Sequence, residues 1–337
     1  MARHTRNAAG SGELLRGGGV RTVHPARRPR PYRCIRGISG IAVEAGARGR
    51  RSVLAAGRRH SAAVRRDGTV AAVGDGRAGE CDVDHWTDVL AVAAGNVHTA
   101  TNTGRSHTVG LRSDGTVLAT GWNGDHQCDV GAWHDVTAVA AGWRRTLGLL
   151  ANGSVLATGR ITEGACDVQD WREIVAISCG DWHSVGLRGD GTALAVGNNR
   201  RGQSALESWH GLTAIAAGAV HTVGLRSDGR VIATGAWSSR ATGVDQWRDV
   251  VALDAGSYHT VAVQASGRVL AAGDNSHGQC DVEAWTDIVA VAAGSAHTLG
   301  LRADGTVVST GNSADGRRDV ASWSGLRRPG TDHPGSD

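Results

Sequence analysis

Tryptophan recurs along this chain at a nearly constant interval. Each step from Trp133 to Trp323 is 38 residues, and the step from Trp86 to Trp133 is 47 residues, nine longer. A fixed period in this range indicates a repeat architecture in which neighbouring units share one continuous core. Seven units of 38 residues plus the nine extra ones match residues 52–326. The tryptophans in register are Trp86, Trp133, Trp171, Trp209, Trp247, Trp285 and Trp323.

The last unit shows what one repeat contains. Val289–Ala293 is a short run of small apolar residues, which is typical of a buried strand, and His297–Arg302 alternates as a second strand. We expect a two-residue hairpin turn at Asp304-Gly305, because Asp-Gly accepts the positive φ of such turns. Val307–Thr310 is then a third strand, and Asp319–Trp323 is expected to form a short outer one.

Three or four short strands repeated seven times predict an all-β, seven-bladed β-propeller. Glycine makes up 50 of the 337 residues and phenylalanine is absent, which fits short strands joined by tight turns. An open solenoid is the alternative, but it should show polar capping repeats at its ends, and the first and last units look like the others. We expect each recurring tryptophan to pack between neighbouring blades.

Histidine and cysteine also recur in register. Histidine follows Gly-x-x in six units, whereas the third unit has Arg145 there. Equivalent positions lie in different blades, so neither a shared metal site nor disulfides are expected. Each histidine precedes Ser or Thr, which suits a structural, hydrogen-bonded role. The residues are His60, His107, His183, His221, His259 and His297, with Cys81, Cys128, Cys166 and Cys280 as the recurring thiols.

The charge divides the chain into a leader and a body. Residues 1–50 carry 11 Arg and 2 Glu, whereas the remaining 287 residues carry 25 Arg and 30 acidic residues. We expect a basic, disordered leader over 1–51, which an upstream start codon could also explain, and a disordered tail over 327–337. No apolar run of about 18 residues occurs and no clear signal peptide is present, so a cytoplasmic location is expected, with secretion as the alternative.

The repeats resemble a known family. Ala216–Gly235 reads AAGAVHTVGLRSDGRVIATG and Ala271–Val282 reads AAGDNSHGQCDV. Both resemble repeats of the regulator of chromosome condensation family, in a compact bacterial version. The resemblance implies a seven-bladed propeller. Its founding member is an exchange factor for a small nuclear GTPase and binds chromatin, so a GTPase partner is implied by the resemblance only; fold does not fix function.

Two sets of loops are expected to emerge on the same face of the ring, those after the first and those after the third strand of each unit. This variable face carries unusual large or charged residues, the types enriched at interaction hot spots, and loops on a rigid scaffold often carry function. The nine-residue insert, near 96–104, also falls here. The candidate partner-binding residues are Arg58, Arg59, Trp122, His126, Trp143, Arg144, Asp181, Trp182, Arg200, Arg201, Trp237, Arg240, Tyr258 and His277.

The sequence therefore predicts a non-catalytic module that binds an unidentified protein partner through the variable face, without cofactor or metal. No catalytic triad spacing, glycine-rich phosphate loop or paired-carboxylate motif stands out. The alternatives are an exchange-factor-like or chromatin-associated regulator, a propeller enzyme and a lectin. Nucleic-acid binding would depend on the basic leader, because the acidic body lacks the cationic surface that phosphate contacts need.

Overall fold

The computed structural model describes residues 51–95, 105–236, 238 and 240–330, all within the compact unit Gly37–Asp337. These residues form 21 strands in seven antiparallel sheets of three strands each. Within each sheet, the order in space is the order along the chain. No helix among the described residues has the length and apolar character needed to cross a membrane.

Each sheet is one blade, numbered here from 1 to 7 along the chain. The first strands are β1 (Leu54–Ala56), β4 (Val89–Ala94), β7 (Val136–Gly142), β10 (Ile174–Cys179), β13 (Leu212–Ala217), β16 (Val250–Ala255) and β19 (Ile288–Ala293). The second strands are β2 (His60–Val64), β5 (His107–Arg112), β8 (Arg145–Leu150), β11 (His183–Arg188), β14 (His221–Arg226), β17 (His259–Gln264) and β20 (His297–Arg302). The third strands are β3 (Val70–Gly74), β6 (Val117–Gly121), β9 (Val155–Gly159), β12 (Ala193–Gly197), β15 (Val231–Gly235), β18 (Val269–Gly273) and β21 (Val307–Gly311).

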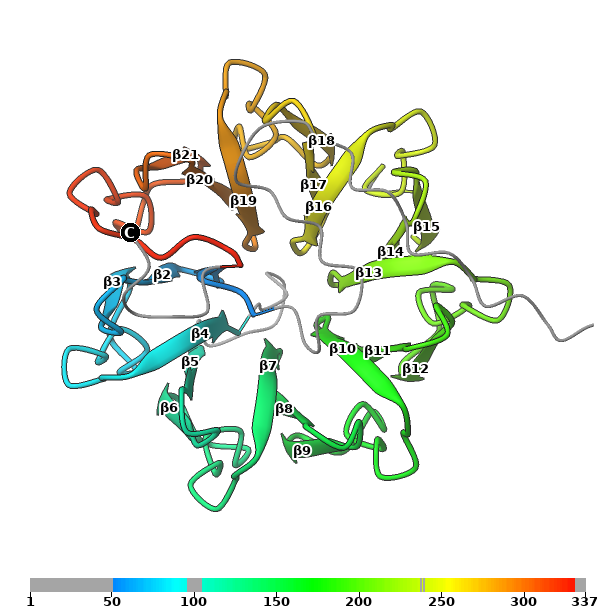
Figure 1. The fold of residues 1–337 in the computed structure, drawn as a ribbon, viewed down its shortest axis with the longest axis horizontal. Coiled ribbons are helices and arrows are strands. Elements are labelled where there is room, and N and C mark those ends of the chain that lie inside the picture. The colour runs from blue at the N-terminus through cyan, green and yellow to red at the C-terminus, as the bar shows by residue number, and fades with distance from the viewer. Residues whose placement is uncertain (1–50, 96–104, 237, 239, 331–337) are drawn as a thin grey trace, which may run out of the picture. The chain divides into compact units, whose positions relative to one another are not determined.

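The blades close into a ring. The first strand of each blade lies nearest the centre and contacts the first strands of both neighbours (Figure 1). Blade 1 contacts blade 7 through β1 against β19 and β20, and Arg65 forms an antiparallel bridge with Leu326. The seven-bladed propeller predicted from the period is therefore confirmed, and the open solenoid was the wrong alternative.

The outer edge of the blade differs from the prediction. The third strand is the outermost strand of each blade, and no fourth strand follows it in the described residues. Asp319–Trp323, expected as an outer strand, forms turns in which the Asp319 amide donates to Gly316 and the Trp323 amide to Val320. The expectation of an outer strand here was wrong, because the backbone hydrogen bonds of this segment are local.

The Asp-Gly turn also differs in detail. Only the glycine has positive φ, as at Gly305 (+87°), and the Gly305 amide donates to Arg302 O at 3.0 Å. Asp304 Oδ1 instead accepts from the Thr306 amide at 2.8 Å and from its hydroxyl at 2.7 Å. The turn is thus a longer one closed by a left-handed glycine, and the aspartate stabilises it as a side-chain acceptor.

The tryptophan in register packs between blades, as expected. Its indole lies against the middle of the second strand of the next blade, where five blades have glycine; a Cβ there would stand 2.6–2.9 Å from the ring. The other two tryptophans share core clusters with alanines at the same strand position. The pairs are Trp86 with Gly110, Trp133 with Gly148, Trp171 with Gly186, Trp209 with Gly224, Trp285 with Gly300, Trp247 with Ala262 and Trp323 with Ala63.

The strand bounds locate the insert. Twelve residues separate β4 from β5, whereas three separate the first and second strands in five other blades. The nine extra residues therefore lie between these strands, on the predicted variable face. Residues 96–104 themselves lie outside the described residues.

Candidate interaction face

The loops after the first and third strands meet on one face, as predicted. Arg144, between β7 and β8, forms an ion pair of 3.2 Å with Asp125, which follows β6. On blade 1, Arg59 lies 3.5 Å from Asp75, after β3. The Asp-Gly turns lie at the opposite end of the strands with the links between blades, since the Val89 amide donates to Gly68 O. We keep the name variable face for the first set of loops.

Three tryptophans and two arginines gather on this face over blades 2 to 4. The rings of Trp143 and Trp182 are 4.3 Å apart at their centroids, inclined at 60°. The Arg144 guanidinium lies 4.5 Å from the ring centroid of Trp122 and 5.0 Å from that of Trp143. Arg160 lies 4.8 Å from the Trp143 ring. We call these five residues the tryptophan cluster; its cation–π contacts hold the guanidinium groups in place.

Sequence reasoning missed one member of this cluster, Arg160. Arg160 follows β9 directly and forms an ion pair of 2.7 Å with Glu163. Its neighbour Ile161 is 72% exposed and is the large apolar side chain that stands out from the surface of the described residues. Four other blades have Asp or Asn directly after the third strand, as at Asp75 and Asn198. Departure from that pattern was the available signal, and the same signal had identified Trp122.

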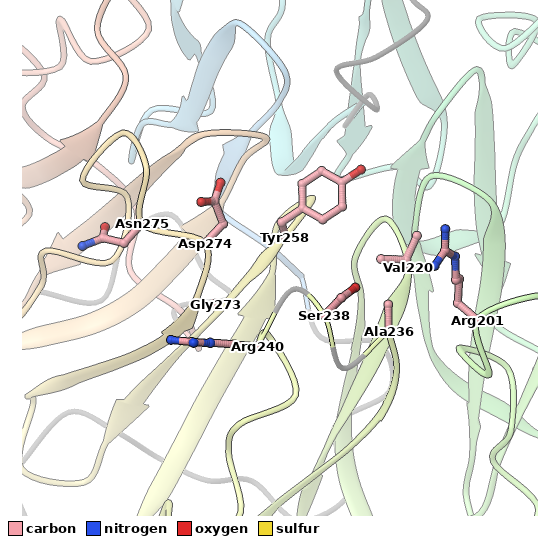
Figure 2. Close-up of a pocket in the computed structure, with 9 residues that line it drawn as sticks. All are labelled: Arg201, Val220, Ala236, Ser238, Arg240, Tyr258, Gly273, Asp274 and Asn275. Carbon is pink, nitrogen blue, oxygen red and sulfur yellow. The ribbon is translucent and has the colours of Figure 1, made fainter.

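A hollow of about 690 Å³ lies on the same face over blades 4 to 6. Figure 2 shows Arg201 and Arg240 on opposite sides of it, with Tyr258 between them. Both arginines are exposed. The described lining residues are Arg201, Val220, Ala236, Ser238, Arg240, Tyr258, Gly273, Asp274 and Asn275.

Two predicted residues share a strained position in the loop after the third strand. The loop after the third strand contains a left-handed residue that is glycine in five blades, as at Gly202 (φ +80°) and Gly278 (φ +79°). Blade 2 has His126 there (φ +67°) and blade 5 has Arg240 (φ +56°). A residue with a Cβ pays about 1–2 kcal/mol for this conformation, so these two side chains are retained against a local cost.

The remaining predicted residues fall into three groups. Arg200 and His277 are exposed on loops of the same face. Trp237 lies outside the described residues. Arg58, Trp143 and Asp181 are buried, with 7%, 6% and 1% of their surface exposed, so they support the face from below.

Comparison with known proteins identifies the repeat. Residues 89–127, 174–203, 250–279 and 288–317 match the model of the regulator of chromosome condensation (RCC1) repeat. The chain carries RCC1 repeats. The four matched segments hold the strands of blades 2, 4, 6 and 7 and the loops that follow their third strands. The RCC1-type propeller expected from the sequence motifs is confirmed.

Solved structures share this fold at low identity. The ectodomain of the receptor kinase ACR4 from Arabidopsis thaliana is 16% identical, with a TM-score of 0.63, over 80% of this chain and 98% of that one. The CR4 ectodomain from Physcomitrella patens is 19% identical (TM-score 0.62, 77% and 73%). Yeast RCC1 (Prp20) bound to Kap60 is 17% identical (TM-score 0.56, 87% and 86%). No curated protein matches the chain in sequence.

The recurring histidines of the RCC1 repeats join neighbouring blades. Each is buried, and its Nε2 lies within hydrogen-bond distance of the Ser or Thr hydroxyl in the next blade. That hydroxyl donates to a backbone carbonyl, for example Thr222 to Gln203 O at 2.7 Å, so Nε2 carries the proton. The pairs are His60–Thr108 (2.9 Å), His107–Thr146 (2.9 Å), His183–Thr222 (2.7 Å), His221–Thr260 (3.0 Å), His259–Thr298 (2.9 Å) and His297–Ser61 (2.9 Å).

Burial holds these histidines neutral. It lowers the pKa of His60 and His259 to about 4 and that of His183 and His221 to about 3. The Nδ1 atoms of these four histidines are buried without a hydrogen-bond partner among the described residues, so a second proton would have no acceptor there. The expected structural role fits this geometry, and no three metal-binding side chains come together among the described residues.

A buried carboxylate, that of Asp181, lies between β10 and β11 of the RCC1-type propeller. Burial raises the pKa of Asp181 to about 7, and the charges of Arg145 and Arg58 oppose that rise. Both carboxylate oxygens are buried and accept no hydrogen bond from the part of the chain that the structure describes. Arg58 belongs to blade 1 and Asp181 to blade 4, so the two charges act on each other across the ring.

Proposed function

We propose that this RCC1-repeat propeller is a protein-interaction module that binds a partner protein through its variable face. The tryptophan cluster is the observation that carries the proposal. Its indole rings and guanidinium groups are fixed by mutual contacts before any partner binds, which reduces the entropy lost on association. Trp and Arg are also the residue types that dominate binding energies at protein interfaces.

Ile161 gives the cluster an apolar contact point. It is 72% exposed and directly follows Arg160, whose guanidinium lies on Trp143. Burying a side chain of this size stabilises a complex by about 1.5–3 kcal/mol. A partner surface that covers blades 2 to 4 would therefore contact Ile161 first and the edges of the tryptophan cluster around it.

The experiment compares two carboxylates added to opposite faces. Ile161→Asp places one on the variable face. The matched control Ser266→Asp places one in the Ser-Gly turn of blade 6, at a position where five of the other blades already have Asp. Both sites are exposed. We expect the tagged parent and S266D to retain the same protein from the native lysate, and I161D to lose it. Equal retention by all three proteins would contradict the proposal.

Catalysis has less support. The recurring thiols are partly buried, and burial raises the pKa of Cys81 and Cys128 to about 12 and that of Cys166 and Cys280 to about 11. Few of them are thiolates at neutral pH, which makes them poor nucleophiles. The six histidines are bound to hydroxyls between the blades and face no open site.

A further inference from the structure

Two arginines at the hollow over blades 4 to 6 lack a countercharge. Arg201 and Arg240 are exposed, and their guanidinium groups form no ion pair or hydrogen bond with the described residues. Several other arginines of the variable face pair with an acid of the same loop or of a neighbouring loop. Those pairs are Arg59 with Asp75, Arg144 with Asp125, Arg160 with Glu163 and Arg317 with Asp315.

The acid that lines the hollow does not neutralise them. Asp274 Oδ1 accepts from the Ser276 amide at 3.1 Å, and its Oδ2 accepts from the Ser276 hydroxyl at 3.1 Å and from Gln279 Nε2 at 3.0 Å. Its carboxylate is therefore committed to its own loop. Arg200 adds a further exposed positive charge beside Arg201, so the rim of the hollow is cationic.

The backbone at Arg240 supports a role for its side chain. Arg240 adopts φ +56° at the loop position where five other blades have glycine. Glycine would remove the strain and would keep the Gly243 amide bonded to the residue 240 carbonyl, a contact of 3.0 Å between backbone atoms. Folding alone therefore gives no reason for an arginine here, whereas binding an anion does.

We propose that this hollow binds a carboxylate-rich segment of the partner protein, with Arg201 and Arg240 pairing with its acidic side chains from opposite sides. The proposal rests on the proposed function and adds the chemistry of the partner. Guanidinium groups pair with carboxylates in a planar, two-bond geometry. Because the hollow is about 690 Å³ in volume, it accepts several side chains of a loop or tail rather than a single ion.

The probe is a fluorescein-labelled hexaglutamate peptide, titrated at low salt and followed by fluorescence anisotropy. We expect binding that weakens as salt is added, and a loss of about tenfold or more in affinity for both R201Q and R240G, since each removes a charged pair. R268Q removes the same charge from the opposite face, and His126→Gly makes the same backbone change in blade 2. Both should bind like the parent, and hexalysine should not bind.

Three results would overturn the proposal. The first is that hexaglutamate does not bind. The second is that R201Q and R240G bind hexaglutamate as well as the parent does. The third is that a single-stranded oligonucleotide binds more tightly than hexaglutamate and that the same two substitutions abolish its binding. Partner capture separates this proposal from the broader one. If R201Q/R240G retains the native partner as well as the parent does, the acidic-segment proposal fails and the proposed function stands. Specific hexaglutamate binding without any captured protein would leave only the hollow supported.

Discussion

Arg145 donates its Nε hydrogen to the hydroxyl of Ser184 at 3.0 Å, in the place where the other six blades have a histidine bound to the next blade. Its other nitrogens donate to three carbonyls of blade 4: Nη1 to Asp181 at 3.0 Å, and Nη2 to Gly180 at 2.6 Å and to His183. The arginine is 1% exposed. It thus joins blades 3 and 4 through four hydrogen bonds and lies close enough to Asp181 for its charge to act on that carboxyl.

Replacing Arg145 by alanine should destabilise the fold strongly. Three carbonyls and the Ser184 hydroxyl would lose a donor, and Asp181 would lose a nearby cation, at a cost of about 3–5 kcal/mol. Arg145→His can restore one bond to Ser184 and should cost less. Urea unfolding of the three proteins measures this. Loss of under about 1 kcal/mol in R145A would contradict the assigned role.

Each hydroxyl between blades serves two partners, which makes it sensitive to substitution. Thr222 accepts from His183 at 2.7 Å and donates to Gln203 O at 2.7 Å, and it is fully buried. Thr222→Val keeps the shape but leaves both partners unsatisfied, so we expect a loss of about 1–3 kcal/mol. Thr234→Val is the control, because this half-buried hydroxyl makes a single bond, to Gly202 O. Equal unfolding midpoints for the two variants would be the contrary result.

The ring should lose stability as the pH falls below 6.5. Unfolded histidines take up protons there, whereas burial keeps the pKa of five folded ones near 3–4 and lowers that of His297 well below its usual value. The stability they give at neutral pH is therefore lost between about pH 6.5 and 4. Burial raises the pKa of Asp181 to about 7 and that of Asp254 to about 6, which acts in the opposite direction.

On unfolding between those pH values, the six histidines take up six protons and the two aspartates release two, so the net uptake is four protons. At about 1.4 kcal/mol per proton and pH unit, the steepest slope is about 5 kcal/mol per pH unit. Urea unfolding at pH 7.5, 6.5 and 5.5 checks the direction. A variant of the exposed His210 should behave like the parent, and constant stability across this range would refute the account.

The glycine beneath each indole is expected to be a packing requirement. Gly186→Ala would place a Cβ 2.8 Å from the Trp171 ring, and we expect a loss of about 1–3 kcal/mol from overpacking. Ala262 occupies the same strand position in blade 6 and shares a core cluster with Trp247, so Ala262→Gly is the reverse test. It should lose stability through a small cavity and added chain entropy. A stabilised G186A would show that the indole can move aside.

Glycine at the two strained loop positions should stabilise the fold. Arg240→Gly and His126→Gly each remove a left-handed residue with a Cβ and should add about 1 kcal/mol to the free energy of unfolding. The exposed ion pair of His126 with Asp129 offsets little of this gain. Denaturant midpoints measure the change. A destabilised R240G would indicate that its side chain supports the loop, in conflict with the binding role.

The positions of the strands were largely predictable from the sequence. His297–Arg302 was expected as a strand and is β20 to the residue, and the expected Val289–Ala293 differs from β19 by one residue. The residue patterns that predict strands and glycine-containing turns span only a few residues. Because the sequence repeats, each pattern can be read in seven units. The outer strand expected at Asp319–Trp323 was wrong. Local sequence cannot show whether a segment at the edge of a sheet finds a hydrogen-bonding partner.

The sequence alone determined the number of blades, the face on which the variable loops emerge and the residues that join neighbouring units, since all of these follow from a constant period and strand direction. Only the tertiary structure decided which loop residues meet. Arg144 lies on Trp122 of another blade, and Asp181 is buried where the charge of Arg58 acts on it. Arg201 and Arg240 form no ion pair with an acid among the described residues. Those outcomes depend on the angle between blades and on side-chain packing across the ring, which residue spacing does not encode.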